Sequence, residues 1–192
     1  MQTLKIFSEL KKRYEVFIKA RRALISKGNS ILSFSKQAIF AYQRGQIKEG
    51  DIFLKKAEKI LKDVDKKFIK KDPSLLLEGS LKSAQEEFVE AFLLQKIIQR
   101  KPLTPITGFN VNLESYFGGL CDVIGEISRY SVNLASSGEE KSVLYFRQQA
   151  ENIMKELVKF NFTGYLRTKY DQAKNSFKKI EEVYYDIKIK RR

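Results

Sequence analysis

Helical spacing of apolar residues over most of the chain is the feature that most constrains the fold. Apolar side chains recur every three or four residues, and no alternation typical of strands persists in any stretch. Only three prolines, Pro73, Pro102 and Pro105, interrupt this pattern. The sequence therefore predicts an all-α fold.

The turn signals divide the pattern into six or seven helices. With 192 residues and 43% hydrophobic content, the chain is long enough for one core, so we expect a single-domain antiparallel bundle over residues 1–192. Asn110 and Asn112 are alternative caps for the fourth helix. The expected helices cover roughly residues 3–42, 52–68, 73–101, 112–136, 140–160 and 166–187.

Two residue types limit the chemistry. Cys121 is the single cysteine and histidine is absent, which excludes intramolecular disulfides, thiolate zinc cages, Ser-His-Asp triads and Cys-His dyads. A metal ion in this protein must be held by oxygen atoms, which favours hard cations such as Mg²⁺, Mn²⁺ or Ca²⁺.

The net charge of +14 is distributed unevenly. Residues 1–72 carry 19 basic and 8 acidic residues, and residues 161–192 carry 9 and 4, whereas residues 73–160 carry 9 and 11. Such a surplus predicts a polyanionic partner, either a nucleic acid or an anionic membrane, because neutralised phosphates release counterions. The alternative is a basic surface that serves solubility alone.

The chain has no apolar run of the roughly 20 residues that cross a bilayer. Its first residues also lack the apolar block and cleavage site of a signal peptide. We therefore expect a cytoplasmic protein without a membrane partner.

Carboxylates interrupt the apolar face of the third predicted helix. Glu87 and Glu90 lie within about 60° of each other on a helical wheel, on the side that carries Ala91 and Leu94. A buried, unpaired carboxylate costs several kcal/mol or takes up a proton, so these acids need a partner.

The fourth predicted helix has a polar stripe of its own, spaced four, three and four. Two helices that follow one another are expected to pack as antiparallel neighbours, which would place one carboxylate pair opposite the other. Gly118 and Gly119 would let the helices approach closely. The stripe consists of Asp122, Glu126, Arg129 and Asn133.

Four acids in a small dry space require a cation, because like charges a few ångströms apart force proton uptake. A divalent ion held by the carboxylates would activate a nucleophile and stabilise the leaving oxygen of a phosphodiester. Di-iron chemistry is excluded, because the Glu-x-x-His motif needs histidine. The alternative is a structural salt-bridge network in which Arg129 and a lysine neutralise the acids.

At these residues the sequence resembles the translin family. The segments "GEISRYSVN" and "SSGE" are similar to its signature helix and turn, "SFSKQAIFAYQR" to its first helix, and "LRTKYDQAKNSFKKIEEVYYDIKI" to its last helix. The resemblance implies an all-helical subunit of an octameric homo-oligomer that binds single-stranded RNA and single-stranded DNA. In catalytic members of the family, acids hold Mg²⁺ for RNA cleavage.

The resemblance also assigns residues. Glu87 and Glu90 match the acids of the family's "EYVEA" motif, and Asp122 and Glu126 match its Asp-x-x-x-Glu. These four are the expected ligands of Mg²⁺ or Mn²⁺ and the expected catalytic residues. Lys36 and Arg129 are the expected nucleic-acid contacts; alternatively they pair with the acids, or Lys36 serves solubility.

Three functions follow from the sequence. The first is a Mg²⁺-dependent endoribonuclease acting on single-stranded RNA, whose phosphates are also expected to contact lysines in residues 53–71. The second is a non-catalytic single-strand binder with structural acids. The third is a membrane-surface or scaffold protein that uses the lysine-rich second helix, which the many buried-type positions disfavour.

Overall fold

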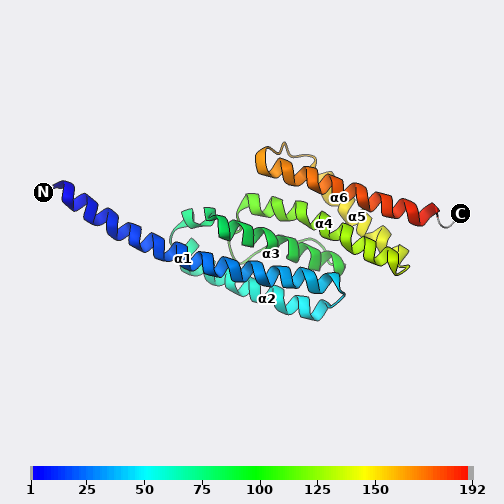
Figure 1. Cartoon of the computed structure of the whole chain (residues 1–192), viewed down its shortest axis with the longest axis horizontal. Helices are drawn as coiled ribbons and strands as arrows, with labels where there is room; N and C mark the ends of the chain where they lie inside the picture. Colours follow the sequence, from blue (N-terminus) through cyan, green and yellow to red (C-terminus); the bar gives the residue numbers. More distant parts are fainter. Residues whose placement is uncertain (1, 190–192) are drawn as a thin grey trace.

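Six α-helices form the protein in the computed structural model, which describes residues 2–189 (Figure 1). No strand occurs in this range, so the predicted all-α fold is confirmed. The α-helices are α1 (Gln2–Gln43), α2 (Ile47–Val64), α3 (Gly79–Ile98), α4 (Leu113–Ser136), α5 (Glu140–Leu157) and α6 (Gly164–Ile189).

Two short helices lie between α2 and α3. A π-helix, η1 (Asp65–Ile69), continues α2, and a 3₁₀-helix, η2 (Pro73–Leu77), follows it. Asp72 caps η2, because its Oδ1 accepts a hydrogen bond from the Ser74 N–H at 3.1 Å. Pro73 suits the first turn because it has no N–H to satisfy there. The third helix was expected to begin at Pro73 but begins at Gly79.

The helix α3 lies at the centre of the bundle, with α1 against one side and α4 against the other (Figure 1). The helix α2 packs on α1, and both α5 and α6 pack on α4. Residues buried between these layers form one continuous core that includes Leu24, Leu61, Phe88, Ile127 and Ile180. The core therefore surrounds the helix that carries Glu87 and Glu90.

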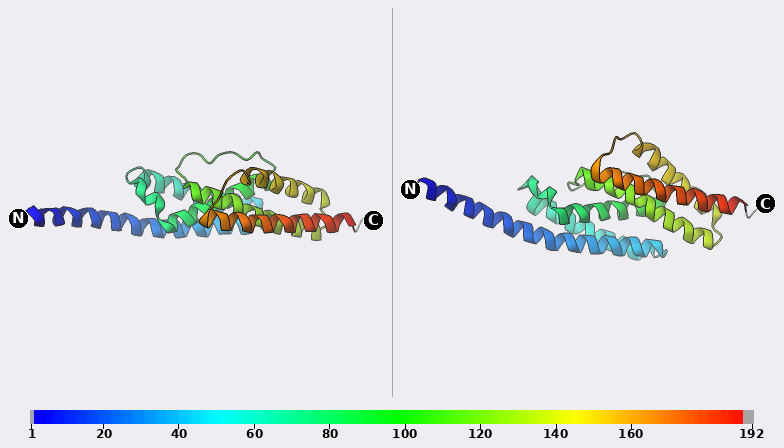
Figure 2. Two further views of the ribbon diagram at one scale, coloured as in Figure 1. Left: turned by 90° about the horizontal axis from the view of Figure 1, so that it is seen from above. Right: turned by 45° about the horizontal axis from the view of Figure 1, so that its top comes forward.

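The expected antiparallel arrangement of the third and fourth helices is wrong, because α3 and α4 run in the same direction. Lys82 lies beside Glu114 and Ser115 at one end, and Val89 lies beside Gly119 further along. The connecting loop, residues 99–112, returns along the length of α3 (Figure 2). Fourteen extended residues reach about 50 Å at most, more than the roughly 30 Å length of a 20-residue helix.

The returning loop is held by side chains of the body. The Asp65 carboxylate accepts hydrogen bonds from the backbone N–H and Nδ2 of Asn110, at 3.0 and 2.8 Å. Gln85 Nε2 donates to the Asn110 carbonyl, and Gln85 Oε1 accepts from the Asn112 N–H. Asn112 then caps α4 by accepting from the N–H groups of Glu114 and Ser115. These bonds fix where α4 begins beside α3.

The N-terminal half of α1 extends beyond the body, and the chain ends lie at opposite extremes of the long axis (Figure 1). Every side chain from residue 5 to residue 17 is exposed. Several of these side chains are large and apolar. They are Ile6, Phe7, Leu10, Tyr14, Val16 and Phe17.

Candidate functional site

The two acids predicted on the third helix lie side by side on α3. Glu90 is only 8% exposed, and Glu87 is partly buried one turn earlier. Within residues 2–189, neither carboxylate makes a hydrogen bond or an ion pair. An unpartnered carboxylate in this position is a strong destabilising element unless a proton or a cation neutralises it.

The acids of α4 face the same region. Asp122 and Glu126 are both partly buried, and their charges add to the effect of burial in raising the pKa of Glu87 and of Glu90. The structure therefore brings all four predicted acids together. We call these four residues, together with Glu86 of α3, the acid cluster.

Glycines make this juxtaposition sterically possible. A Cβ at position 118 would collide with the carboxylate of Glu86, and one at position 119 would lie 2.7 Å from Val89 Cβ and 2.8 Å from the Glu86 carbonyl oxygen. Both glycines are buried. They let α4 approach α3 closely, as predicted, and this approach brings the acids of the two helices together.

A lysine that the sequence reasoning missed reaches the acid cluster from α6. Lys169 Nζ donates to Asp122 Oδ2 at 2.6 Å and lies 2.9 Å from Glu86 Oε1. The Tyr165 hydroxyl donates to the same Glu86 oxygen at 2.6 Å. The C-terminal helix therefore supplies the positive charge nearest to Asp122.

Glu126 has one partner from α1 and one from its own helix, α4. Gln43, the last residue of α1, donates through Nε2 to Glu126 Oε2 at 2.7 Å and to the Glu126 carbonyl oxygen at 2.8 Å. Arg129 Nη1 lies 3.2 Å from Glu126 Oε1, and its side chain is 57% exposed. Arg129 thus pairs with the acids, which was one of its two predicted roles.

The acid cluster shifts the pKa values of its members. Burial, followed by the charges of Glu87, Asp122 and Glu126, raises the pKa of Glu90 to about 9. Burial also raises the pKa of Glu87 and of Asp122, although Lys36 opposes the shift at Glu87 and Lys169 opposes it at Asp122. More negative charge gathers here than the protein's own cations neutralise.

Lys36 lies on the exposed surface of α1, and its charge lowers the pKa of Glu87 against the effect of burial. Lys36 is therefore near the acid cluster, but it makes no hydrogen bond or ion pair with any residue in the range 2–189. This placement leaves its ammonium group available to an anion at the edge of the cluster.

The donor set of the acid cluster suits a hard divalent cation, because it consists of carboxylate oxygens with excess negative charge. As the side chains stand, however, no three Asp, Glu or Cys residues within the described range are arranged to hold a metal ion. The reason is visible in the contacts, since Asp122 is turned to Lys169 and Glu126 to Gln43 and Arg129. Ion binding would require these side chains to exchange partners.

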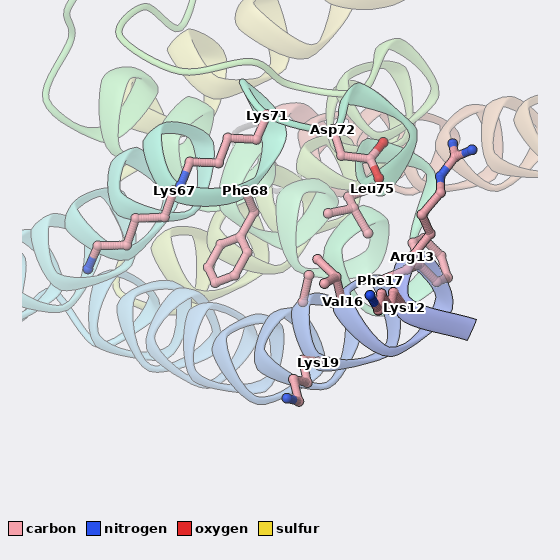
Figure 3. A pocket seen from close by; sticks show the side chains of 11 residues that line it. Lys12, Arg13, Val16, Phe17, Lys19, Lys67, Phe68, Lys71, Asp72 and Leu75 are labelled. Carbon is pink, nitrogen blue, oxygen red and sulfur yellow. The ribbon is translucent and has the colours of Figure 1, made fainter. Parts of the chain in front are cut away.

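A second site candidate lies far along the surface, in a hollow of about 680 Å³ between α1 and the η1–η2 segment (Figure 3). Its floor is apolar and includes Phe17, Phe68 and Leu75. We call it the basic hollow, because its rim carries five cations and a single acid, Asp72, and it shares no residue with the acid cluster. The cations are Lys12, Arg13, Lys19, Lys67 and Lys71.

Comparison with known proteins identifies the family. The sequence profile described as "Translin family" matches residues 19–191. The chain belongs to the translin family. The matched range contains the whole acid cluster as well as Lys36, Arg129 and Lys169. The predicted family resemblance is therefore confirmed.

Individual translin relatives match over shorter stretches. Translin of Homo sapiens is 28% identical over 116 residues, which is 54% of this chain and 51% of that protein. Translin of Gallus gallus is 31% identical over 84 residues, 43% and 37% of the two chains. The chain thus spans about half the length of the curated translins that it matches.

Solved structures of the same fold match nearly the whole chain. A crystal structure of AfC3PO superimposes with a TM-score of 0.88 at 25% identity, covering 96% of this chain and 98% of that one. AfC3PO in a complex with duplex RNA gives a TM-score of 0.87 at 25% identity, covering 96% and 97%. Apo-NeC3PO gives 0.82 at 21% identity, covering 94% and 96%, and shows likeness of fold alone.

None of the helices in residues 2–189 combines the length and the apolar character that crossing a bilayer requires.

Proposed function

We propose that this translin-family protein is a divalent-metal-dependent endoribonuclease that cleaves single-stranded RNA. The observation that carries the proposal is the unpartnered, 8% exposed carboxylate of Glu90, which lies among Glu87, Asp122 and Glu126. The complex of a similar fold, AfC3PO, with duplex RNA supports RNA as the ligand. Single-stranded DNA is a further proposed ligand.

The excess negative charge fits a bound cation, and the four carboxylates of Glu87, Glu90, Asp122 and Glu126 would hold it. A bound Mg²⁺ or Mn²⁺ would favour deprotonation of a water molecule and would stabilise negative charge at the scissile phosphate. One of these four carboxylates would also orient the attacking water.

Positive side chains at the edge of the cluster would position the RNA. Arg129 is more than half exposed and Lys36 is exposed, so both can reach a phosphate without being pulled from the core. Lysines of α2 and η1, within residues 53–71, would contact phosphates further along the strand. Their effect would weaken with salt.

We further propose that the subunits assemble into a cytoplasmic homo-octamer. The exposed apolar side chains on the N-terminal half of α1 support assembly, because isolated subunits seldom expose such a stripe. Cross-linking and light scattering would measure the number of subunits.

A non-catalytic RNA-binding protein is the second candidate. It is supported by the contacts that Lys169, Gln43 and Arg129 make with Asp122 and Glu126. In this function the carboxylates would stabilise the contact between α3, α4 and α6 and would not take part in chemistry.

One assay separates the two candidates. A labelled single-stranded RNA is incubated with the full chain in Mg²⁺, in Mn²⁺ and in EDTA, with a duplex of the same sequence in parallel. The nuclease cleaves the single strand in either ion and leaves it intact in EDTA. Binding without cleavage in both ions would favour the non-catalytic protein.

A further inference from the structure

Lys169 differs from the other cations that form ion pairs in residues 2–189. Its side chain is 18% exposed, whereas those of its counterparts are 27% to 76% exposed. Surface ion pairs contribute little, because water and salt screen them. A lysine that is removed from water to this extent needs well-placed partners, and Lys169 has two carboxylates.

The ammonium group of Lys169 lies against Asp122, one of the four proposed ligands of a divalent ion. Its Nζ lies 2.6 Å from Asp122 Oδ2. An ammonium and a divalent ion at one carboxylate would repel each other strongly in a partly buried site. The two cations are therefore competitors for Asp122.

The Lys169 ammonium group has a second set of partners besides Asp122. Its Nζ lies 2.9 Å from Glu86 Oε1 and 5.5 Å from the centre of the Tyr165 ring, whose hydroxyl donates to the same Glu86 oxygen. Glu86 and Tyr165 line a hollow of about 400 Å³ that opens to solvent. The ammonium can leave Asp122 and keep a carboxylate and an aromatic face as partners.

We propose that Lys169 is an internal counter-ion that occupies the acid cluster in the metal-free protein and moves from Asp122 toward Glu86 when a divalent ion binds. The inference rests on the proposed function in one respect, namely that Asp122 is a ligand of the ion. Lys169 is then a positioning residue, and it weakens the binding of the ion to the resting protein.

Manganese binding to the full chain tests this proposal by calorimetry, independently of cleavage. Lys169→Met removes the charge and keeps most of the stem. We expect it to bind Mn²⁺ about tenfold more tightly than the unaltered protein, because the competitor is gone. Without metal, the variant should melt at a lower temperature, and Mn²⁺ should raise its melting temperature by more.

Two variants serve as controls. Lys174→Met makes the same change in net charge at an exposed position of α6, and its Mn²⁺ affinity should stay within twofold of the unaltered protein. Lys169→Arg retains the charge and should retain the competition. Adding Asp122→Asn to Lys169→Met should abolish the tenfold difference if the two side chains act through each other.

A folded Lys169→Met protein with equal or weaker Mn²⁺ affinity would overturn the proposal. If Lys169→Met fails to fold, Glu86→Gln tests the proposal instead, because this substitution removes the second carboxylate partner of the Lys169 ammonium group. Affinity about threefold weaker than in the unaltered protein supports the exchange, and unchanged or tighter affinity overturns it.

The result also separates this proposal from the nuclease. Mn²⁺ binding by Lys169→Met with none by the unaltered protein would support the lysine's role and count against a metal-dependent activity of the natural chain. Binding by neither protein would overturn both proposals. Binding by both with the expected difference, but without RNA cleavage, would overturn the nuclease alone.

Discussion

The acid cluster and the basic hollow are built in opposite ways. The cluster lies between α3, α4 and α6, and its most buried member, Glu90, is 8% exposed. The hollow lies between α1 and the η1–η2 segment, and its cations are the side chains of exposed lysines and one exposed arginine. Burial makes each charge of the cluster costly in free energy unless it has a partner. Exposure makes the interactions of each charge at the hollow weak, so that one cation can replace another.

This difference predicts where single substitutions act. In the cluster, one substitution should abolish a function. At the hollow, several cations should share a function, so each loss should be partial and should depend on salt.

The largest effect is expected from Glu90→Gln and from Asp122→Asn. Each should lower the rate of RNA cleavage at least about 100-fold, because each removes a proposed ligand charge. Fluorescence anisotropy should show RNA affinity within threefold of the unaltered protein. Asp171→Asn, which alters an exposed acid of α6, is the control. Full cleavage by either cluster variant would refute the assignment of the site.

The next effect concerns the close approach that assembles the cluster. Gly119→Ala would place a Cβ 2.7 Å from Val89 Cβ and 2.8 Å from a backbone oxygen. We expect the free energy of unfolding to fall by about 1–3 kcal/mol, measured by urea denaturation.

Gly125→Ala is the matched control on the same helix. Its Cβ would meet only Ser176 Oγ, at 3.7 Å. This substitution should leave stability unchanged or raise it by up to about 1 kcal/mol, because alanine favours a helix over glycine. Equal losses at both glycines would show that the contact between α3 and α4 is looser than described.

A smaller effect is expected at the basic hollow. The double variant Lys67→Ala/Lys71→Ala should weaken single-stranded RNA binding about tenfold. It should also reduce the salt dependence of log K by about 1.4, or about 0.7 for each phosphate that is no longer neutralised. Cleavage at saturating RNA should be unchanged. Lys155→Ala/Lys159→Ala, in the last turn of α5 and two residues beyond its end, makes an equal change in charge and should bind normally. Equal weakening by both pairs would mean that overall charge, and not the hollow, attracts RNA.

The smallest effect is a pH dependence of metal-free stability. The pKa of Glu90 is about 9 in the folded protein, against its ordinary 4.5. Below pH 4.5 this carboxyl is protonated in both states and the folded form is not penalised. As the pH rises toward 9, the unfolded chain releases its proton more readily, so stability falls.

We therefore expect the melting temperature in EDTA to decline between pH 5 and pH 9. In Glu90→Gln the decline should be smaller by at least roughly 5 °C, because each kcal/mol of stability shifts the melting temperature of a chain of this size by about 2–4 °C. Glu87 and Asp122, whose pKa values are also raised, would account for the remainder. Identical slopes in the two proteins would contradict the assignment of the shift to Glu90.

The elements of the fold could be read from the sequence because they depend on local spacing. In the last helix, for example, apolar residues recur at intervals of three and four from Leu166 to Ile187, and this apolar seam places Ala173 and Ile180 in the core. Asn112 caps α4 as one of the two predicted candidates. The direction of α4 could not be read in this way. The loop of residues 99–112 is long enough to return along α3, and only distant contacts such as Asp65 with Asn110 decide that it does.

The site was predictable to the same extent. The spacing of Glu87 and Glu90 identifies an acidic face on α3, and the structure brings it against Asp122 and Glu126. Lys169 was missed because its partners are 47 and 83 residues earlier in the chain. A signal was present, since Lys169 lies three residues after Leu166 and four before Ala173, at the edge of this apolar seam.

The helix α1 also determines where the Gln43 amide lies. It packs closely against Ser80 of α3 at Gly28 and ends at Gln43, which donates a hydrogen bond to Glu126. One residue inserted between Gly28 and Gln43 would rotate the C-terminal end of α1 by about 100° and move the Gln43 amide away from the Glu126 carboxylate. Changes in the length of this helix would therefore disturb the acid cluster least upstream of Ala20, the first residue of α1 that packs against the core. The contacts at the two ends of the segment from Gly28 to Gln43 therefore fix its number of residues.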